Sequence, residues 1–127
     1  MTVVRDYMSA RLVYVAEGSR PRVALQPMLE LGVATVPVLD ESHRPVGVIS
    51  MRDLIESKDH PTISTPVKTI LASATIEEAA RAMVDANIHH LVVVDDKGHA
   101  VGMLSALDVV RASIGAKPKH PSMLEKI

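Results

Sequence analysis

Short apolar runs separated by polar residues occur in the same order in the two halves of the chain. Residues 36–39 and 46–49 are two such runs, and the polar residues 40–45 lie between them. Residues 91–94 and 101–104 repeat this arrangement. Two apolar runs joined by a short polar stretch predict a β-hairpin. We therefore expect one hairpin in each half of the chain.

The second hairpin has two further features. The run at residues 91–94 contains no polar position, so we expect that strand to be covered on both faces. Gly98 lies in the turn that follows, where a glycine can adopt the positive φ that tight hairpin turns need.

A helix is predicted before each hairpin. In the first half it extends from about Pro21 to Leu31, and Pro27 should bend it because proline removes a mid-helix hydrogen bond. In the second half, Thr75 and Glu78 match a capping box, and the helix should end near Asn87. Its apolar face is expected to consist of Ile76, Ala79, Ala80, Met83 and Val84.

Each half also has a short strand before its first helix and a second helix after its hairpin. The strands are expected near residues 12–15 and 68–71, and the closing helices should begin at Ser50 and Ser105. Each half therefore reads strand, helix, strand, strand, helix. This order predicts a mixed α/β (α+β) fold made of two β-α-β-β-α repeats.

A constant spacing of 55 residues relates the two halves. Gly47, Ser50 and Asp53 return as Gly102, Ser105 and Asp108. The same spacing joins further pairs, which are Ala24 and Ala79, Met28 and Met83, Val38 and Val93, Asp40 and Asp95, and Val46 and Val101. Such a repeat predicts two units that bury their apolar faces against each other, because about 55 residues bury too little surface to be stable alone.

The repeat sets the expected domain boundaries. We assign residues 1–58 to the first repeat, 59–114 to the second and 115–127 to a mobile C-terminal tail. Within that tail, Met123 and Leu124 are apolar and are expected either to stay loose or to dock on a partner.

Composition narrows the classes of function. The chain has 14 Lys and Arg against 15 Asp and Glu, so no charge excess indicates a nucleic-acid or membrane partner. It has no cysteine, which excludes disulfides and zinc–thiolate sites and suits a cytoplasmic protein. No signal-peptide core or membrane-spanning apolar run is present. Aromatic residues are limited to Tyr7 and Tyr14, so the core should be aliphatic.

The repeat and its motifs resemble a pair of CBS domains, also called a Bateman module. The resemblance rests on Gly-apolar-apolar-Ser-x-x-Asp at the end of each half and on the strands Val-Pro-Val-Leu-Asp and Leu-Val-Val-Val-Asp before it, and it covers roughly residues 3–113. It implies two pseudo-symmetric β-α-β-β-α repeats about a pseudo-two-fold axis, packed sheet to sheet, with two clefts between them. Such clefts commonly bind AMP, ADP, ATP or S-adenosylmethionine, and many members form dimers of two modules.

The resemblance also implies a role. We expect a free-standing, non-enzymatic regulatory module that senses an adenosine-containing ligand, forms a homodimer and acts on an unknown protein target. We expect no catalytic cofactor. The alternative is a structural module that oligomerises or docks on a partner without bound nucleotide.

Ser50 and Asp53, with their repeats Ser105 and Asp108, allow two interpretations. Ser-x-x-Asp at a helix start is a common capping arrangement. The same geometry presents free N–H groups that attract phosphate, and a carboxylate one turn later can accept both hydroxyls of a ribose. The family resemblance assigns the ligand role to this motif. The two interpretations are compatible, because capping prepares the site.

The two motifs differ at one position, where the first half has Arg52 and the second has Leu107. An exposed arginine on a helix is commonly just solvated, but beside Ser50 it can form a forked pair with phosphate oxygens. Leu107 supplies no such charge. We therefore expect two unequal clefts.

His89 and His90 precede the central strand of the second half, where the first half has Ala34 and Thr35. In nucleotide-binding members, such as the gamma subunit of the AMP-activated kinase, a His-Arg pair at this place reaches phosphates. His89 matches that histidine. His90 replaces the arginine, which predicts a pH-dependent contact.

The resemblance implies that each cleft joins the Ser-x-x-Asp motif of one repeat to the pre-strand residues of the other. The ligand-binding residues of the first cleft would be Ser50, Arg52, Asp53, Ile88, His89 and His90, with Ile63 and the backbone of Lys68 near its base. Those of the second would be Ser105, Asp108, Val33, Ala34 and Thr35, with Met8 and Val13. The first is expected to bind phosphorylated ligands more tightly.

Other classes of site find little support in the sequence. No nucleophile elbow or pair of catalytic carboxylates is present. A metal site would have to use His89, His90 and His99 with Asp95 or Asp96, and their spacing matches no known ligand motif. A nucleic-acid site would need a basic face and stacking aromatics.

Overall fold

The computed structural model describes residues 2–10, 12–56, 65, 67–119 and 125–126. The chain divides into two compact units. One unit contains Val13–Val67 and Glu125–Ile127, and the other contains Met1–Leu12 and Lys68–Leu124. Each unit holds one of the predicted repeats. The segment Met1–Leu12, called the N-terminal lead-in below, belongs to the unit of the second repeat.

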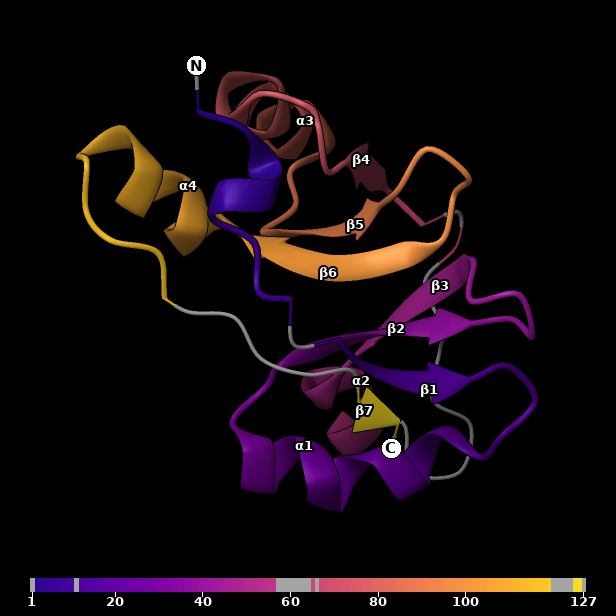
Figure 1. Cartoon of the computed structure of the whole chain (residues 1–127). Helices are drawn as coiled ribbons and strands as arrows, with labels where there is room; N and C mark the ends of the chain where they lie inside the picture. Colours follow the sequence, from indigo (N-terminus) through magenta and orange to yellow (C-terminus); the bar gives the residue numbers. More distant parts are fainter. Residues whose placement is uncertain (1, 11, 57–64, 66, 120–124, 127) are drawn as a thin grey trace. The chain divides into compact units, whose positions relative to one another are not determined.

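The unit of the first repeat is a sheet with helices on one face (Figure 1). Its sheet has the strand order β3-β2-β1-β7, in which β1 is parallel to β2 and to β7 and antiparallel pairing joins β2 to β3. Its elements are β1 (Val13–Ala16), a 3-10 helix η2 (Pro21–Ala24), α1 (Leu25–Leu31), β2 (Thr35–Leu39), β3 (Pro45–Ser50), α2 (Met51–Glu56) and β7 (Glu125–Lys126).

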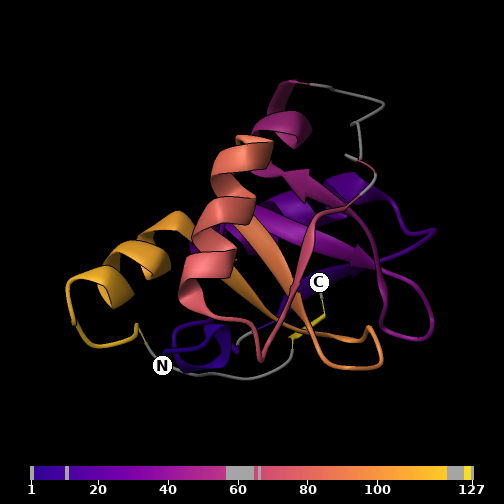
Figure 2. The same ribbon diagram turned by 90° about the horizontal axis from the view of Figure 1, so that it is seen from above.

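The unit of the second repeat has the same order of elements. Its sheet has the order β4-β5-β6, and α3 crosses one face of that sheet beside α4 (Figure 2). Its elements are a 3-10 helix η1 (Val4–Asp6), β4 (Thr69–Leu71), α3 (Ile76–Ala86), β5 (His90–Val94), β6 (Ala100–Ser105) and α4 (Ala106–Ser113).

The predicted repeat is confirmed down to the register of the hairpins. Val38 faces Gly47 and Val93 faces Gly102, and both ladders shift register directly after these pairs. The mixed α/β class and the order strand, helix, strand, strand, helix are therefore confirmed in both halves. The expected sheet-to-sheet packing of the two repeats stays a prediction.

Positive φ angles also recur at equivalent positions with different residues. The helix before each hairpin ends in a left-handed residue, Gly32 in the first repeat and Asn87 in the second. The turn of each hairpin contains another, His43 with φ 63° and Gly98 with φ 85°. Asparagine, histidine and glycine adopt this region more readily than other residues, so the backbone is conserved between the repeats although the side chains change.

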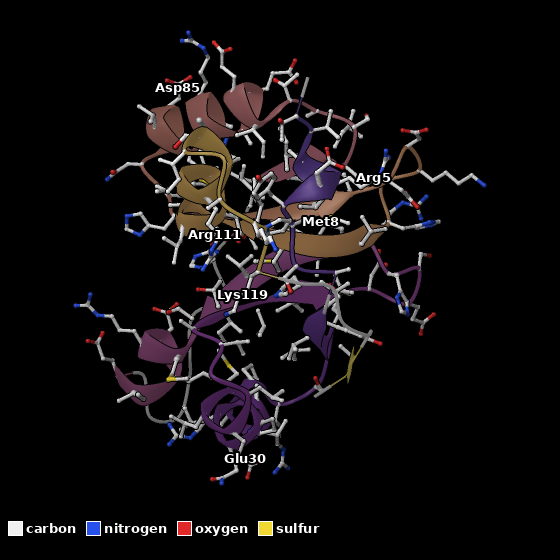
Figure 3. All side chains as sticks on the ribbon, turned by 60° about the vertical axis from the view of Figure 1, so that its left-hand side comes forward. Arg5, Met8, Glu30, Asp85, Arg111 and Lys119 are labelled. Carbon is white, nitrogen blue, oxygen red and sulfur yellow. The ribbon has the colours of Figure 1, made fainter. Side chains whose placement is uncertain are left out.

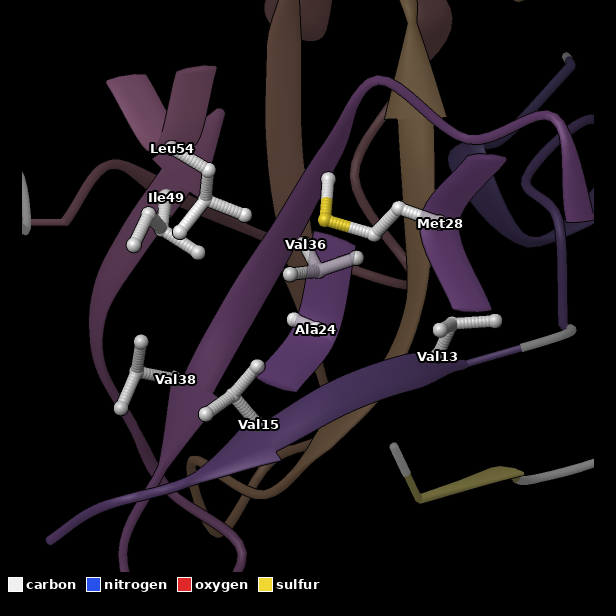
Figure 4. Packing of buried hydrophobic residues seen from close by; sticks show 8 residues of the cluster. All are labelled: Val13, Val15, Ala24, Met28, Val36, Val38, Ile49 and Leu54. Atoms are coloured by element: carbon white, nitrogen blue, oxygen red, sulfur yellow. The ribbon is translucent and has the colours of Figure 1, made fainter. Parts of the chain in front are cut away.

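The core of the first repeat is aliphatic, as the composition predicts. It is formed by residues of the strands and helices that all point to one face of the sheet (Figure 4): Val13, Val15, Ala24, Met28, Val36, Val38, Ile49 and Leu54. In the second repeat, all four residues of the apolar run 91–94 are buried. This agrees with the expectation that its central strand is covered on both faces.

Pro27 does not break the middle of a helix. The 3-10 turn of η2 ends at Ala24 and a new α-helix begins at Leu25, so Pro27 falls in the first turn of α1. There the N–H has no intrahelical acceptor to lose. The expected irregularity is present, but it lies at the junction of the two helices.

Two details of α3 differ from the prediction. Thr75 accepts the backbone N–H of Glu78 at 3.1 Å, but among the described residues Glu78 returns no bond to Thr75, so only half of the capping box forms. Val84 was expected on the apolar face, yet its side chain is 77% exposed. Ala79 and Met83 carry the buried face, because the face is narrower than the five apolar positions indicate.

The chain ends are tied to the two units. Val4 is buried in the core of the second repeat, and its N–H donates to the carbonyl of Ala74 at 2.8 Å. Near the other end, the hydroxyl of Tyr7 donates to the carbonyl of Ala116 at 2.7 Å, and the mobility predicted for residues 115–127 stays a prediction. Further on, β7 pairs with β1. Met123 and Leu124 lie outside the described residues.

Candidate functional site

The Ser-x-x-Asp motif of the first repeat stands at the end of β3 and the start of α2. The hydroxyl of Ser50 accepts the N–H of Asp53 at 3.0 Å, and Oδ2 of Asp53 accepts the N–H of Ser50 at 3.3 Å. Ser50 faces Thr35 across the ladder, and the N–H of Met51 donates to the carbonyl of Ala34 at 2.8 Å. The motif therefore lies directly beside the pre-strand residues of its own repeat.

The second repeat reproduces this geometry. The hydroxyl of Ser105 accepts the N–H of Asp108 at 3.1 Å, and Oδ2 of Asp108 accepts the N–H of Ser105 at 2.8 Å. Ser105 faces His90, and the N–H of Ala106 donates to the carbonyl of His89 at 2.8 Å. Both predicted capping arrangements form, which leaves the capping and ligand interpretations compatible.

The two carboxylates differ in their surroundings. Asp108 is only 6% exposed and is the one buried charged residue in the described part of the chain. Its Oδ1 accepts a hydrogen bond from Nη1 of Arg111 at 2.9 Å, and Figure 3 shows Arg111 on α4. Asp53 is half-buried, and Ser50 is its only hydrogen-bond partner among the described residues. The carboxylate of Asp53 is therefore the more available of the two.

Arg52 extends from the surface of α2. Its Nε lies 3.0 Å from Oε1 of Glu56, and its side chain is 83% exposed. The hydrogen bond and the charge of Glu56 raise the pKa of Arg52. Exposed pairs of this kind contribute little to stability, so a phosphate group can compete for the guanidinium at low cost.

His90 is half-buried beside the second motif. Burial lowers the pKa of His90, the neighbouring His89 lowers it further, and the negative charge of Asp108 acts in the opposite direction. His90 is therefore held more strongly in its neutral form than a solvated histidine.

The remaining predicted site residues have mostly structural surroundings. Val13 is buried in the core of the first repeat and pairs with Glu125 of β7 in the parallel ladder, and Val33 packs at the edge of that core. Met8 and Ile88 pack against the core of the second repeat. The carbonyl of Lys68 accepts the N–H of Val92 at 3.3 Å. Ile63 lies outside the described residues.

Arg111 is the site residue that sequence reasoning missed. The sequence does contain a signal for Arg111. The spacing of 55 residues aligns Arg111 with Glu56, so the residue one turn after the motif is acidic in the first repeat and basic in the second. In the first repeat Glu56 binds Arg52, whereas in the second Arg111 binds Asp108. The combination of motifs with pre-strand residues of the opposite repeat stays a prediction.

The described part of the chain has neither a cluster of metal ligands nor a helix that could span a membrane. No group of three or more His, Asp or Glu side chains there is arranged to hold a metal ion. Nδ1 of His99 lies 3.5 Å from Oδ2 of Asp95. Oδ1 of Asp95 accepts the backbone N–H groups of Lys97 and His99. The N–H of His99 is the main cause that lowers the pKa of Asp95. No described helix has the length and apolar character needed to cross a membrane.

Comparison with protein families and curated sequences identifies relatives. The model of the CBS domain matches residues 4–60 and again residues 62–115. An uncharacterized protein of Methanopyrus kandleri is 30% identical over 111 residues, which are 76% of this chain and 57% of that protein. A homoserine O-acetyltransferase of Methanosphaerula palustris is 32% identical over 124 residues, 92% of this chain but 25% of the enzyme. The chain thus spans between a quarter and about half of these relatives.

Solved structures show the same fold. The chain is similar to CBSX2, a CBS-pair protein of Arabidopsis thaliana solved in complex with AMP, with a TM-score of 0.79 and 27% identity over 91% of this chain and 98% of that chain. It is also similar to the cytosolic domain of the Mg²⁺ channel MgtE in complex with ATP, with a TM-score of 0.74 and 29% identity over 84% of this chain and 46% of that chain. A CBS domain pair in complex with 5-methylthioadenosine and S-adenosyl-L-methionine, at 23% identity and a TM-score of 0.80, shows the fold alone.

Proposed function

This chain belongs to the CBS domain family, and on that premise we propose that it is a non-enzymatic regulatory module that binds an adenosine-containing ligand. The observation that carries the proposal is the half-buried carboxylate of Asp53, which has a hydroxyl beside it and an oxygen without a partner among the described residues. The AMP and ATP complexes of the relatives at 27% and 29% identity support the ligand class. The ligands to test are AMP, ADP, ATP and S-adenosylmethionine.

In the proposed recognition, a carboxylate binds the ribose of the ligand, and a hydroxyl and a guanidinium bind its phosphate. Asp53 accepts hydrogen bonds from the ribose hydroxyls through its unpaired Oδ1. Ser50 and Arg52 bind phosphate, the latter by exchanging the carboxylate of Glu56 for phosphate oxygens. Asp108 is the weaker ribose ligand, because Arg111 already occupies its Oδ1. The first motif is therefore the primary half-site.

Thermal unfolding with a panel of the four ligands tests the proposal. A ligand present at about 100 times its dissociation constant adds about 2.7 kcal/mol to the free energy of unfolding. We expect at least one ligand of the panel to raise the unfolding temperature, while guanosine and cytidine nucleotides at the same concentration do not. If no adenosine compound raises it, the regulatory-ligand proposal fails.

The role of Arg52 has its own test. Arg52→Ala should weaken the binding of nucleotides and leave the binding of adenosine unchanged, because a charge-assisted contact to phosphate is worth about 1.5–3 kcal/mol. Leu107→Ala, the same truncation at the equivalent position of the second repeat, is the matched control and should leave both affinities unchanged. A double-mutant cycle between Arg52 and His89 then tests whether the motif of one repeat works together with the pre-strand residues of the other.

The proposal includes a homodimer in the cytoplasm. Several helices of the described chain and the C-cap of α4 expose large apolar residues that a second copy could cover, which are Leu29, Ile55, Val84, Leu107 and Val110 in the helices and Ile114 at the cap. The cysteine-free sequence suits a reducing compartment. Light scattering at micromolar concentration should give twice the mass of one chain. A mass of one chain across that range would refute the dimer.

A second candidate function is a structural module that docks on a partner protein without nucleotide. The observation that favours it is the complete local pairing of the second motif, in which Ser105, Asp108 and Arg111 satisfy one another. A motif that is fully paired in this way needs no ligand to account for it. This function would stand if no ligand of the panel bound but the homodimer or a partner complex formed.

A further inference from the structure

A hollow of about 620 Å³ lies at the hairpin of the first repeat. This volume is in the range of small-molecule sites. The hollow is at the end of the β2–β3 ladder where Leu39 faces Pro45, whereas the Ser-x-x-Asp motif is at the other end, where Thr35 faces Ser50. Its described lining shares no residue with the predicted half-sites. Its described lining residues are Tyr14, Ala16, Glu17, Leu39, Asp40, Glu41, Ser42 and His43.

The lining is acidic. It contains three carboxylates, those of Glu17, Asp40 and Glu41, and no Lys or Arg among the described lining residues. Oδ1 of Asp40 accepts the N–H groups of Ser42 and Arg44 at 2.8 and 2.9 Å, and so shapes the turn. Glu17 and Glu41 are exposed, and their carboxylates make no hydrogen bond to a described residue, whereas the backbone N–H of Glu17 donates to the carbonyl of Leu39. Clustered charge of one sign in a concave surface concentrates counter-ions, so the hollow favours a cation.

Tyr14 supplies a second, independent observation. Its side chain is 8% exposed, and its ring centroid lies 5.4 Å from that of His43. The hydroxyl makes no hydrogen bond within the described part of the chain, yet no buried oxygen there is without a partner. The oxygen therefore opens to accessible space, and the hollow that Tyr14 lines is such a space. The side chain therefore combines a buried ring with a hydroxyl that is open to solvent and has no protein partner among the described residues, so a ligand in the hollow can bond to it.

The second repeat does not have these features. At the positions of Tyr14, Glu17 and His43 it has Thr69, Ala72 and Gly98. The backbone of the two hairpins is the same, because Asp95 accepts two backbone N–H groups as Asp40 does. The rings and the extra carboxylate are thus not required by the fold.

We propose that this hollow binds a small organic polyamine. Ammonium groups donate to the carboxylates of Glu17 and Glu41 and to the free hydroxyl oxygen of Tyr14. The methylene chain lies against the rings of Tyr14 and His43, and a charged nitrogen lies near the ring of Tyr14, where a cation within about 6 Å of the aromatic face is attracted by it. The site is independent of the adenosine half-sites.

Calorimetric titration of the whole chain with spermidine tests the site. We expect saturable binding of one spermidine per chain. His43→Gly should weaken it severalfold, because the methylene chain loses its apolar contact with the imidazole ring. This variant should fold at least as well as the wild type, because glycine adopts a positive φ without cost and the second repeat already has Gly98 there. Glu41→Gln should weaken binding by a similar factor.

The matched control is Asp96→Asn, which makes the same charge change at the equivalent position of the second hairpin. It should leave spermidine affinity unchanged. Absence of saturable binding up to millimolar spermidine would overturn the proposal, and so would an equal loss in Asp96→Asn and Glu41→Gln, which would indicate general charge attraction. A parallel titration with AMP separates this outcome from failure of the adenosine proposal, because the His43→Gly variant should bind AMP as the wild type does.

Discussion

Nη1 of Arg111 lies 2.9 Å from Oδ1 of Asp108, and this ion pair has no equivalent in the first repeat. Glu56 stands at the position equivalent to Arg111 and pairs instead with Arg52, while Asp53 keeps an oxygen without a partner among the described residues. One reversal of charge therefore distinguishes two motifs that share their hydrogen-bond geometry. The second motif is internally complete, and the first is open to a ligand.

The burial of this ion pair predicts unequal effects on stability. Asp108→Asn leaves the 25% exposed side chain of Arg111 without its charged partner and should lower the free energy of unfolding by about 2 kcal/mol. Asp53→Asn keeps an acceptor oxygen for the N–H of Ser50 but removes a negative charge from the first turn of α2, and should cost about 0.3–1 kcal/mol. Urea unfolding of both variants measures the difference. Equal losses would show that the pairing of Arg111 with Asp108 contributes nothing.

The surroundings of His90 predict a dependence of stability on pH. Burial, followed by the charge of His89, holds the pKa of His90 below its usual value. The folded state therefore binds this proton less readily than the unfolded state. The resulting stability is fully present above the usual pKa of about 6.5 and is lost as pH falls through the folded pKa.

Titration of the His90 ring by NMR measures this pKa directly. His89→Ala removes a neighbouring positive charge and should move the pKa of His90 upward, toward its usual value. His99→Ala is the control, because His99 pairs with Asp95 on the hairpin and is not among the groups that act on His90. A wild-type pKa at or above 6.5 would contradict the structure.

Gly102 allows the N-terminal lead-in to cross β6 closely. A Cβ at this position would lie 2.6 Å from the carbonyl oxygen of Ser9 and 2.9 Å from the sulfur of Met8. Ser9 and Met103 exchange two backbone hydrogen bonds at 2.9 and 3.1 Å. Gly102→Ala should therefore destabilise the protein by about 1–3 kcal/mol.

Hydrogen exchange shows where that destabilisation acts. In Gly102→Ala, the amides of Ser9 and Met103 should lose protection because the lead-in is displaced. Gly98→Ala is the control, since it strains a positive φ in the hairpin turn and should leave these two amides protected. Unchanged protection of Ser9 in Gly102→Ala would disprove the close crossing.

Much of the fold was predictable because it is encoded locally and twice. The hairpins follow from apolar runs, and Ser50 and Ser105 each begin a helix with the side chain that caps it. Asn87 and Gly98 take the left-handed conformations that their residue types indicate. Two copies of each signal at one spacing removed most of the ambiguity that a single copy would carry.

The features that sequence reasoning missed depend on tertiary contacts. The pairing of β7 with β1 joins residues that are far apart in the chain and have no mutual pattern. The exposure of Val84 depends on how α3 rotates against its sheet. At the site, Arg111 could extend into solvent or pair with Asp108. Side-chain packing decides between the two, and the sequence pattern does not show that packing. That one carboxylate oxygen of Asp53 has no partner among the described residues becomes evident only when the hydrogen bonds of the two motifs are compared.

The most direct test of the central claim is a calorimetric titration of AMP into the wild type, Asp53→Ala and Asp108→Ala. The account predicts saturable binding to the wild type and a loss of roughly tenfold or more in Asp53→Ala, because hydrogen bonds to a charged group are worth about 1.5–3 kcal/mol. Asp108→Ala should retain the wild-type affinity of the primary site, provided that its circular dichroism shows a folded chain. Binding that survives Asp53→Ala but is lost in folded Asp108→Ala would contradict the account, as would the absence of AMP binding to the wild type.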